Sequence, residues 1–207
     1  MAIRTAVNRA LTAITALPTA AALVDGNLTL LTTATASSSA TLDFTSSIDS
    51  TYDSYMFKFI DIHPQTNFRH LGFQANVAGA SGFNETITST AFINQHDEGD
   101  SATILQLEGD GIQQQATGFQ IVLYGMGNEN DESGNGTLHL FDPSNTTFVK
   151  HFIADTNTHT DNDRSSRFFV GGYFNTTSAI DEIQFKMSSG NIDSGVIKMY
   201  GVGDKQS

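Results

Sequence analysis

Cysteine and tryptophan are both missing from the 207-residue sequence, and proline occurs only three times. The lack of cysteine excludes disulfide bonds, thiolate nucleophiles and cysteine-bound metal, so stability has to come from packing and association. Lysine and arginine total ten, which is too few and too scattered for a surface that follows a phosphate backbone. No apolar run approaches the roughly 18 residues of a membrane-spanning helix. We therefore expect neither nucleic acid nor a membrane among the partners.

Recognisable catalytic motifs are also missing. The sequence has no Gly-x-Ser-x-Gly elbow, Walker loop, dinucleotide-binding fingerprint or His-Glu-x-x-His pair. Nothing in the spacing of the 22 acidic residues selects one pair for acid–base chemistry. We therefore expect no enzyme and no cofactor, and we assign no catalytic, cofactor-binding or metal-binding residue.

Charged residues make up only 15% of the chain, against about 25% in a typical soluble domain. Threonine, serine, asparagine and glycine take their place, and the formal net charge is -12. Uncharged polar side chains can pack between subunits without the cost of burying a charge. Fifteen phenylalanines supply material for a hydrophobic core.

The first 24 residues differ from the rest because they contain two arginines and no acid. Apolar residues recur at spacings of three and four, which predicts a short amphipathic helix ended by Pro18; they are Ile3, Val7, Ala10, Ile14 and Leu17. Such a helix either docks on a partner and bundles with its copies, or covers the core of its own domain. The stretch also has weak features of a secretory signal peptide.

Short runs with a period of two fill the chain after a first strand at residues 28–33. Apolar and polar residues alternate, for example, at residues 55–60, 71–77, 119–123 and 196–202. Segments rich in Gly, Asn, Asp and Ser separate these runs and predict turns, one of them at 157–163. The pattern predicts an all-β, antiparallel β-sandwich of the jelly-roll kind over 36–207, preceded by a helical or extended anchoring segment at 1–35.

Two groups of residues have the chemistry of a metal site. Residues 128–136 (NENDESGNG) are rich in the oxygen ligands that calcium prefers, but they do not fit the EF-hand pattern. The alternative is a solvated hairpin loop. His139 and His151 lie in strands that we predict at 137–141 and 147–154 and expect to be neighbours, so the two side chains either share a metal or are ordinary histidines of a sheet.

A sugar-binding surface needs exposed aromatic rings beside hydrogen-bonding side chains. Five aromatic residues are candidates for this role: Tyr52, Tyr55, Phe68, Tyr124 and Tyr173. The alternative is that most of them belong to the core.

Three stretches resemble a family of virion structural proteins from tailed phages, many of them marine. They are 40–64 (ATLDFTSSIDSTYDSYMFKFIDIHP), 136–158 (GTLHLFDPSNTTFVKHFIADTNT) and 171–203 (GGYFNTTSAIDEIQFKMSSGNIDSGVIKMYGVG). The resemblance runs from about residue 36 to residue 203 and includes no catalytic motif. It implies a jelly-roll module on the particle surface that assembles as a homo-oligomer, by family habit a trimer.

The expected function is therefore that of a virion structural protein, displayed on the capsid or tail as a decoration or short-fibre component. Its expected partners are its own copies and other virion proteins of the capsid, tail or adaptor. The short segment before residue 36 favours a compact piece over a long fibre. The alternative function is that of a phage adhesin whose β-sandwich binds a host surface glycan.

Overall fold

The structure is a computed structural model that describes residues 28–203. The helix expected within residues 1–24, the signal-peptide alternative and the anchoring role of residues 1–23 lie outside the described residues. Within residues 28–203 there is no helix that is long and apolar enough to cross a membrane.

All regular structure in the described part of the chain is β. Its thirteen strands are β1 (Leu28–Thr35), β2 (Leu42–Phe44), β3 (Ser54–Pro64), β4 (Arg69–Val77), β5 (Ile87–Asp97), β6 (Thr103–Leu107), β7 (Gln114–Ala116), β8 (Gln120–Met126), β9 (Gly134–Phe141), β10 (Lys150–Thr160), β11 (Arg164–Phe174), β12 (Ile180–Met187) and β13 (Ile192–Val202).

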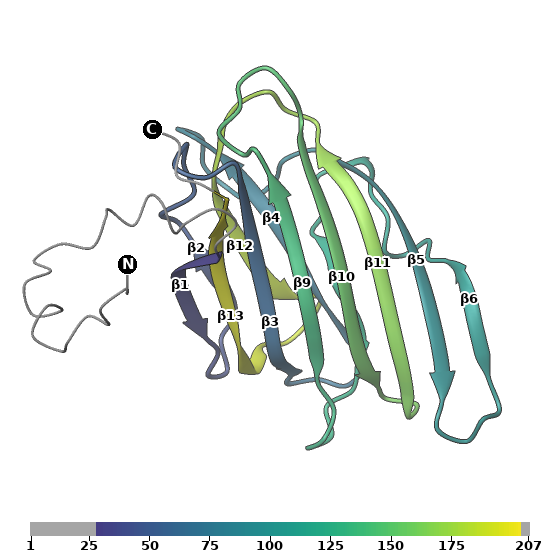
Figure 1. The fold of residues 1–207 in the computed structure, drawn as a ribbon. Coiled ribbons are helices and arrows are strands. Elements are labelled where there is room, and N and C mark those ends of the chain that lie inside the picture. Colours follow the sequence, from purple (N-terminus) through teal and green to yellow (C-terminus); the bar gives the residue numbers. More distant parts are fainter. Residues whose placement is uncertain (1–27, 204–207) are drawn as a thin grey trace, which may run out of the picture.

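Two antiparallel layers have the strand order of a jelly roll. One layer runs β1-β13-β3-β9 and the other runs β2-β12-β4-β8, with most successive strands crossing between layers (Figure 1). Two Greek keys wound into a double sheet give this order. The prediction of an all-β antiparallel sandwich of the jelly-roll kind is confirmed.

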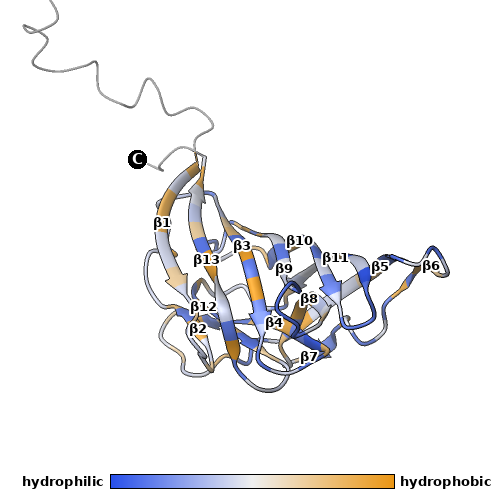
Figure 2. Cartoon of the chain, turned by 90° about the horizontal axis from the view of Figure 1, so that it is seen from below, coloured by the Kyte–Doolittle hydropathy of each residue, from blue (hydrophilic) through white to orange (hydrophobic). Residues whose placement is uncertain are grey.

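Insertions widen only one of the two layers. Strands β10 and β11 follow β9, and β5 pairs with β11 on one side and with β6 and β7 on the other. The large sheet therefore runs β1-β13-β3-β9-β10-β11-β5-β6. In the view from below, β6 lies far to the side of the strands of the small sheet (β2-β12-β4-β8) (Figure 2).

Strand β1 forms one edge of the large sheet. It pairs antiparallel with β13 from Leu28 opposite Val202 to Thr35 opposite Val196. The sheet thus includes the last eight residues of the segment 1–35, which we predicted to be a helical or extended anchor. The strand predicted at residues 28–33 is confirmed.

Phenylalanine rings fill the space between the two sheets. Phe44, Phe57, Phe73 and Phe185 are all at most 1% exposed. Phe185 on β12 contacts rings from both layers, with centroid distances of 5.4 Å to Phe57 and 5.8 Å to Phe44. Edge-to-face packing of this kind adds to the stabilisation that comes from burial alone.

The join between the sheets explains one wrong prediction. We predicted a turn at 157–163, but β10 continues to Thr160. The hydroxyl groups of Thr156 and Thr158 point inward and donate to Val122 O (2.6 Å) and Tyr124 O (2.7 Å) on β8. β8 and β10 pair with each other only at Thr160 and Met126. Because the backbone of β10 does not bond the carbonyls of Val122 and Tyr124, the threonine hydroxyls satisfy them instead.

A second correction concerns the start of the same strand, because we predicted a strand from residue 147. Strand β10 begins at Lys150, and Phe148 lies in the preceding loop with 70% of its surface exposed. The side chain of Asn145 accepts hydrogen bonds from the backbone N–H groups of Thr147 and Phe148. This local turn competes with extension of the strand.

The stability of the fold is expected to fall at alkaline pH because of Tyr55 on β3. Its buried hydroxyl donates to Asp49 O and accepts from Asp49 N, both at 2.9 Å. Burial raises the pKa of Tyr55 to about 12 from an ordinary value of 10.0. Because the folded pKa lies above the unfolded one, this stabilisation is complete below about pH 10 and is lost as the pH rises towards 12.

We therefore expect Tyr55→Phe to cost about 1–3 kcal/mol at pH 8, through the loss of these hydrogen bonds. The wild type should lose on the order of 2 kcal/mol more than the variant between pH 10 and 12. Urea unfolding of both proteins at pH 8 and pH 11.5 measures this. Parallel pH profiles for the two proteins would contradict the role given to Tyr55.

Candidate functional site

A pocket of about 270 Å³ lies beneath the projecting strands of the large sheet. Its walls come from the inward faces of β5 and β6, from β8, from the start of β11 and from the loop before β4. Ten residues line it: Phe68, Ile93, Gln95, Ile104, Gln106, Glu108, Tyr124, Thr160, Asn162 and Arg164. The small sheet ends at β8, so the inner face of β5 and β6 is left open here.

Phe68 is the exposed aromatic ring at this pocket, and its backbone is unusual. The residue has a φ of 49°, a left-handed conformation that a bulky side chain adopts at a cost of about 1–3 kcal/mol. The side-chain oxygen of Asn67 holds the loop, since it accepts from Phe68 N (3.1 Å) and Asn128 N (3.2 Å). The side chain of Phe68 remains 39% exposed.

Gly125 on β8 makes room for the Phe68 ring. It has a φ of 65°, and a Cβ atom at this position would lie 3.1 Å from Cε2 of Phe68. The N–H of Gly125 also donates to Nδ1 of His70 at 2.8 Å, and burial lowers the pKa of His70. His70 is thus held as a neutral acceptor under the aromatic cluster.

Tyr124 joins the pocket to the core. Its ring lies 6.3 Å from Phe68, 4.5 Å from His70 and 5.6 Å from Phe168, centroid to centroid. Burial, and then the nearby carboxylates of Glu108 and Asp110, raise the pKa of the Tyr124 hydroxyl. The hydroxyl therefore stays protonated at neutral pH and acts as a donor at the pocket wall.

Arg164 and Glu108 supply opposite charges to the same pocket. Glu108 is only 8% exposed. The Nε atom of Arg164 is buried and has no hydrogen-bond partner within the part of the chain that the structure describes. Buried polar atoms are nearly always satisfied by protein, water or ligand, so a water or a ligand is the expected acceptor for this N–H.

The structure brings together two of the five aromatic residues that we selected from the sequence, Phe68 and Tyr124. Tyr52 and Tyr55 are buried, at 4% and 0% exposure, and Tyr173 lies on the opposite face of the large sheet. No pattern in the sequence indicated Glu108, Gln106 or Arg164, because strands far apart in the chain bring them together.

The two groups of possible metal ligands do not form a cluster. Among residues 28–203, no three His, Asp or Glu side chains come together in a way that could hold a metal ion. In the acidic loop, Glu132 turns inward and accepts from Glu129 N at 2.6 Å. His139 and His151 lie on neighbouring strands, and each contacts an aromatic ring, Phe141 and Tyr173 respectively.

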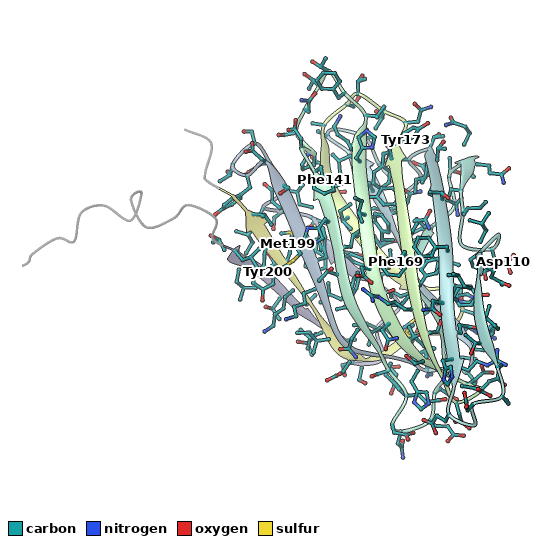
Figure 3. The ribbon with its side chains drawn as sticks, turned by 45° about the vertical axis from the view of Figure 1, so that its right-hand side comes forward. Asp110, Phe141, Phe169, Tyr173, Met199 and Tyr200 are labelled. Atoms are coloured by element: carbon teal, nitrogen blue, oxygen red, sulfur yellow. The ribbon has the colours of Figure 1, made fainter. Side chains whose placement is uncertain are left out.

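The second candidate site is the outward face of the large sheet, which no other layer covers. Within the described residues, seven of the nine large hydrophobic side chains that remain exposed lie on this face. They are Leu28, Leu30, Phe92, Leu105, Leu107, Phe141 and Ile153. Phe141, Phe169, Tyr173 and Tyr200 lie across the same face (Figure 3). We call these ten positions and the residues in register with them the outer face.

Few charges interrupt the outer face. Its cross-strand rows contain Lys58, Lys198, Arg167 and Asp155. Arg167 pairs with Asp155 at 2.7 Å and its guanidinium lies 4.6 Å from the centre of the Phe169 ring. Lys58 and Lys198 lie directly opposite each other on β3 and β13. The outer face thus combines exposed apolar side chains with few charges, and it is slightly basic in a strongly acidic chain.

Comparisons with known proteins add little to this geometry. No family model matches the chain, and no curated protein matches it. A solved structure from Bacteroides ovatus, a structural genomics protein of unknown function, is 8% identical with a TM-score of 0.27. The match covers 51% of this chain and 45% of that one. A match with so low a TM-score says nothing about the function of this chain.

Proposed function

We propose that this protein is a structural subunit of a tailed-phage particle, and that it associates with copies of itself through the outer face. The observation that carries the proposal is the concentration of exposed hydrophobic side chains on that one face. Monomeric proteins rarely leave a large contiguous apolar patch open to water.

The size of the outer face suits a stable contact. Eight strands at a spacing of about 4.8 Å give a width of roughly 34 Å. The outward residues form four cross-strand rows, which pass through His151, Ile153, Asp155 and Asn157 of β10. These rows span about 20 Å along the strands. This corresponds to about 700 Å², close to the roughly 800 Å² that each partner buries in a standard interface.

Charge indicates which surface of the neighbouring copy covers the outer face. A two-fold contact between two outer faces, centred on Lys58 and Lys198, would bring two pairs of lysines together, which is unfavourable. The chain as a whole carries a net charge of -12, so most of a neighbouring copy attracts these lysines. We therefore propose a head-to-tail contact, which closes into a ring, and a trimer is the expected ring.

The particle context is supported by the sequence resemblance over residues 36–203 and agrees with the jelly-roll strand order. Jelly rolls recur in capsid proteins, although a fold alone does not define a function. A test is quantitative mass spectrometry of purified, salt-washed particles of the phage that encodes the chain. We expect several copies of the chain per particle. Particles that lack the chain altogether would contradict the proposal.

A further inference from the structure

We infer that the pocket beneath β5 and β6 is a saccharide-binding site that takes one sugar ring. The inference goes beyond the assembly role and does not depend on it. It rests on the chemistry of the lining residues, on the unpartnered donor of Arg164 and on the exposed ring of Phe68.

The donor of Arg164 points to an oxygen-bearing ligand. Its buried Nε–H has no acceptor among the described residues, and Arg164 is one of the residues that line the open pocket of about 270 Å³. A guanidinium presents several N–H groups in one plane, which suits two neighbouring oxygens better than one. Adjacent hydroxyls on a sugar ring offer such a pair.

The balance of charges and of hydrogen-bonding groups favours a neutral ligand rich in hydroxyls. Arg164 and Glu108 offset each other, so neither a strong anion nor a strong cation is matched by the pocket as a whole. Gln95, Gln106 and Asn162 add amide groups that both donate and accept. A hydroxyl also donates and accepts, so a polyol satisfies this mixture of groups.

Phe68 provides the apolar surface that a sugar ring requires. Its ring is 39% exposed and is fixed from below by Gly125 and from the side by the rings of His70 and Tyr124. A fixed, exposed ring at a pocket lined by polar groups can cover the C–H face of a sugar while those groups bind its hydroxyls.

The size of the pocket fits a single sugar ring, and the pocket lies on the side of the sheet opposite the outer face. Its volume lies just below the roughly 300–1,000 Å³ of pockets for drug-sized ligands. Ile93 and Ile104 line the pocket, whereas their neighbours Phe92 and Leu105 point to the outer face. Because side chains alternate along a strand, this pocket and the outer face lie on opposite faces of the large sheet.

The test uses the full chain on an array of defined glycans, followed by titration calorimetry with the bound sugars and with glucose, galactose, mannose and N-acetylglucosamine. We expect selective binding of at least one saccharide. Phe68→Ala, Arg164→Ala and Gln106→Ala should each weaken it by about tenfold or more. The matched control is Phe148→Ala, which removes an exposed ring that does not line the pocket and should leave the affinity unchanged.

Gln106 is exposed on the edge strand β6, so its substitution reports on binding even where a pocket variant folds poorly. Thermal unfolding of each variant separates loss of fold from loss of affinity. The inference is overturned if no saccharide binds, or if a bound saccharide keeps its affinity in folded Gln106→Ala and Arg164→Ala proteins. Neither result bears on self-association through the outer face.

Discussion

Phe185→Ala should lower the free energy of unfolding by about 3–5 kcal/mol, the usual cost of removing a fully buried phenylalanine. The side chain is 0% exposed and lies within 6.2 Å, centroid to centroid, of the rings of Phe44, Phe57, Phe59 and Phe73. Phe57 and Phe59 belong to the large sheet, and the other two to the small sheet. The cavity would therefore open between the layers, and neither layer can close it alone.

Chemical denaturation followed by circular dichroism measures this loss. Phe148→Ala is the matched control, because that ring is 70% exposed in a loop and its removal should change stability by less than about 0.5 kcal/mol. Equal losses for the two variants would show that the rings between the sheets do not hold the layers together.

Ile153→Asp should break self-association while leaving the subunit folded. Ile153 lies in the middle of the outer face, between His139 on β9 and Gly171 on β11, and is 55% exposed. A carboxylate there costs little in a free subunit but would be desolvated in an interface. We expect association to weaken by about 2–4 kcal/mol, a factor of roughly 30 to 1,000 in the dissociation constant.

Sedimentation equilibrium over a range of concentrations measures this change. Thr177→Asp introduces the same charge at an exposed loop position outside the outer face, so it should associate as the wild type does. If Ile153→Asp retains the wild-type association constant, the outer face is not the contact.

The core of the fold could be predicted from the sequence, because period-two alternation and turn residues mark most strands directly. The lengths of β10 and β11 could not. Inward-facing Thr156 and Thr158 look like part of a polar loop until β8 supplies carbonyls for their hydroxyls. Thr156 and Thr158 thus belong to a strand because they contact residues of β8, which lie 34 positions earlier in the sequence.

Some of the pocket residues could also be selected from the sequence, and others could not. Phe68 and Tyr124 could be selected as exposed-ring candidates by residue type, and the structure places them 6.3 Å apart. Arg164 and Glu108 carry no local signal, since only the pairing of β11 with β5, and of β5 with β6, brings their strands to one place. The outer face could not be predicted either. Its exposed apolar residues come from separate strands, and only the register between these strands shows that they lie on one surface.

The absence of cysteine allows the most direct test of whether copies of the chain cover the outer face. Thr90→Cys places one thiol on that face, in the row of Ile153, and Ser178→Cys places one on an exposed loop elsewhere. Maleimide labelling is followed from dilute to concentrated protein. We predict that the thiol at position 90 becomes protected as concentration rises, while the thiol at 178 reacts at a constant rate. Equal and constant rates at both positions would contradict the account.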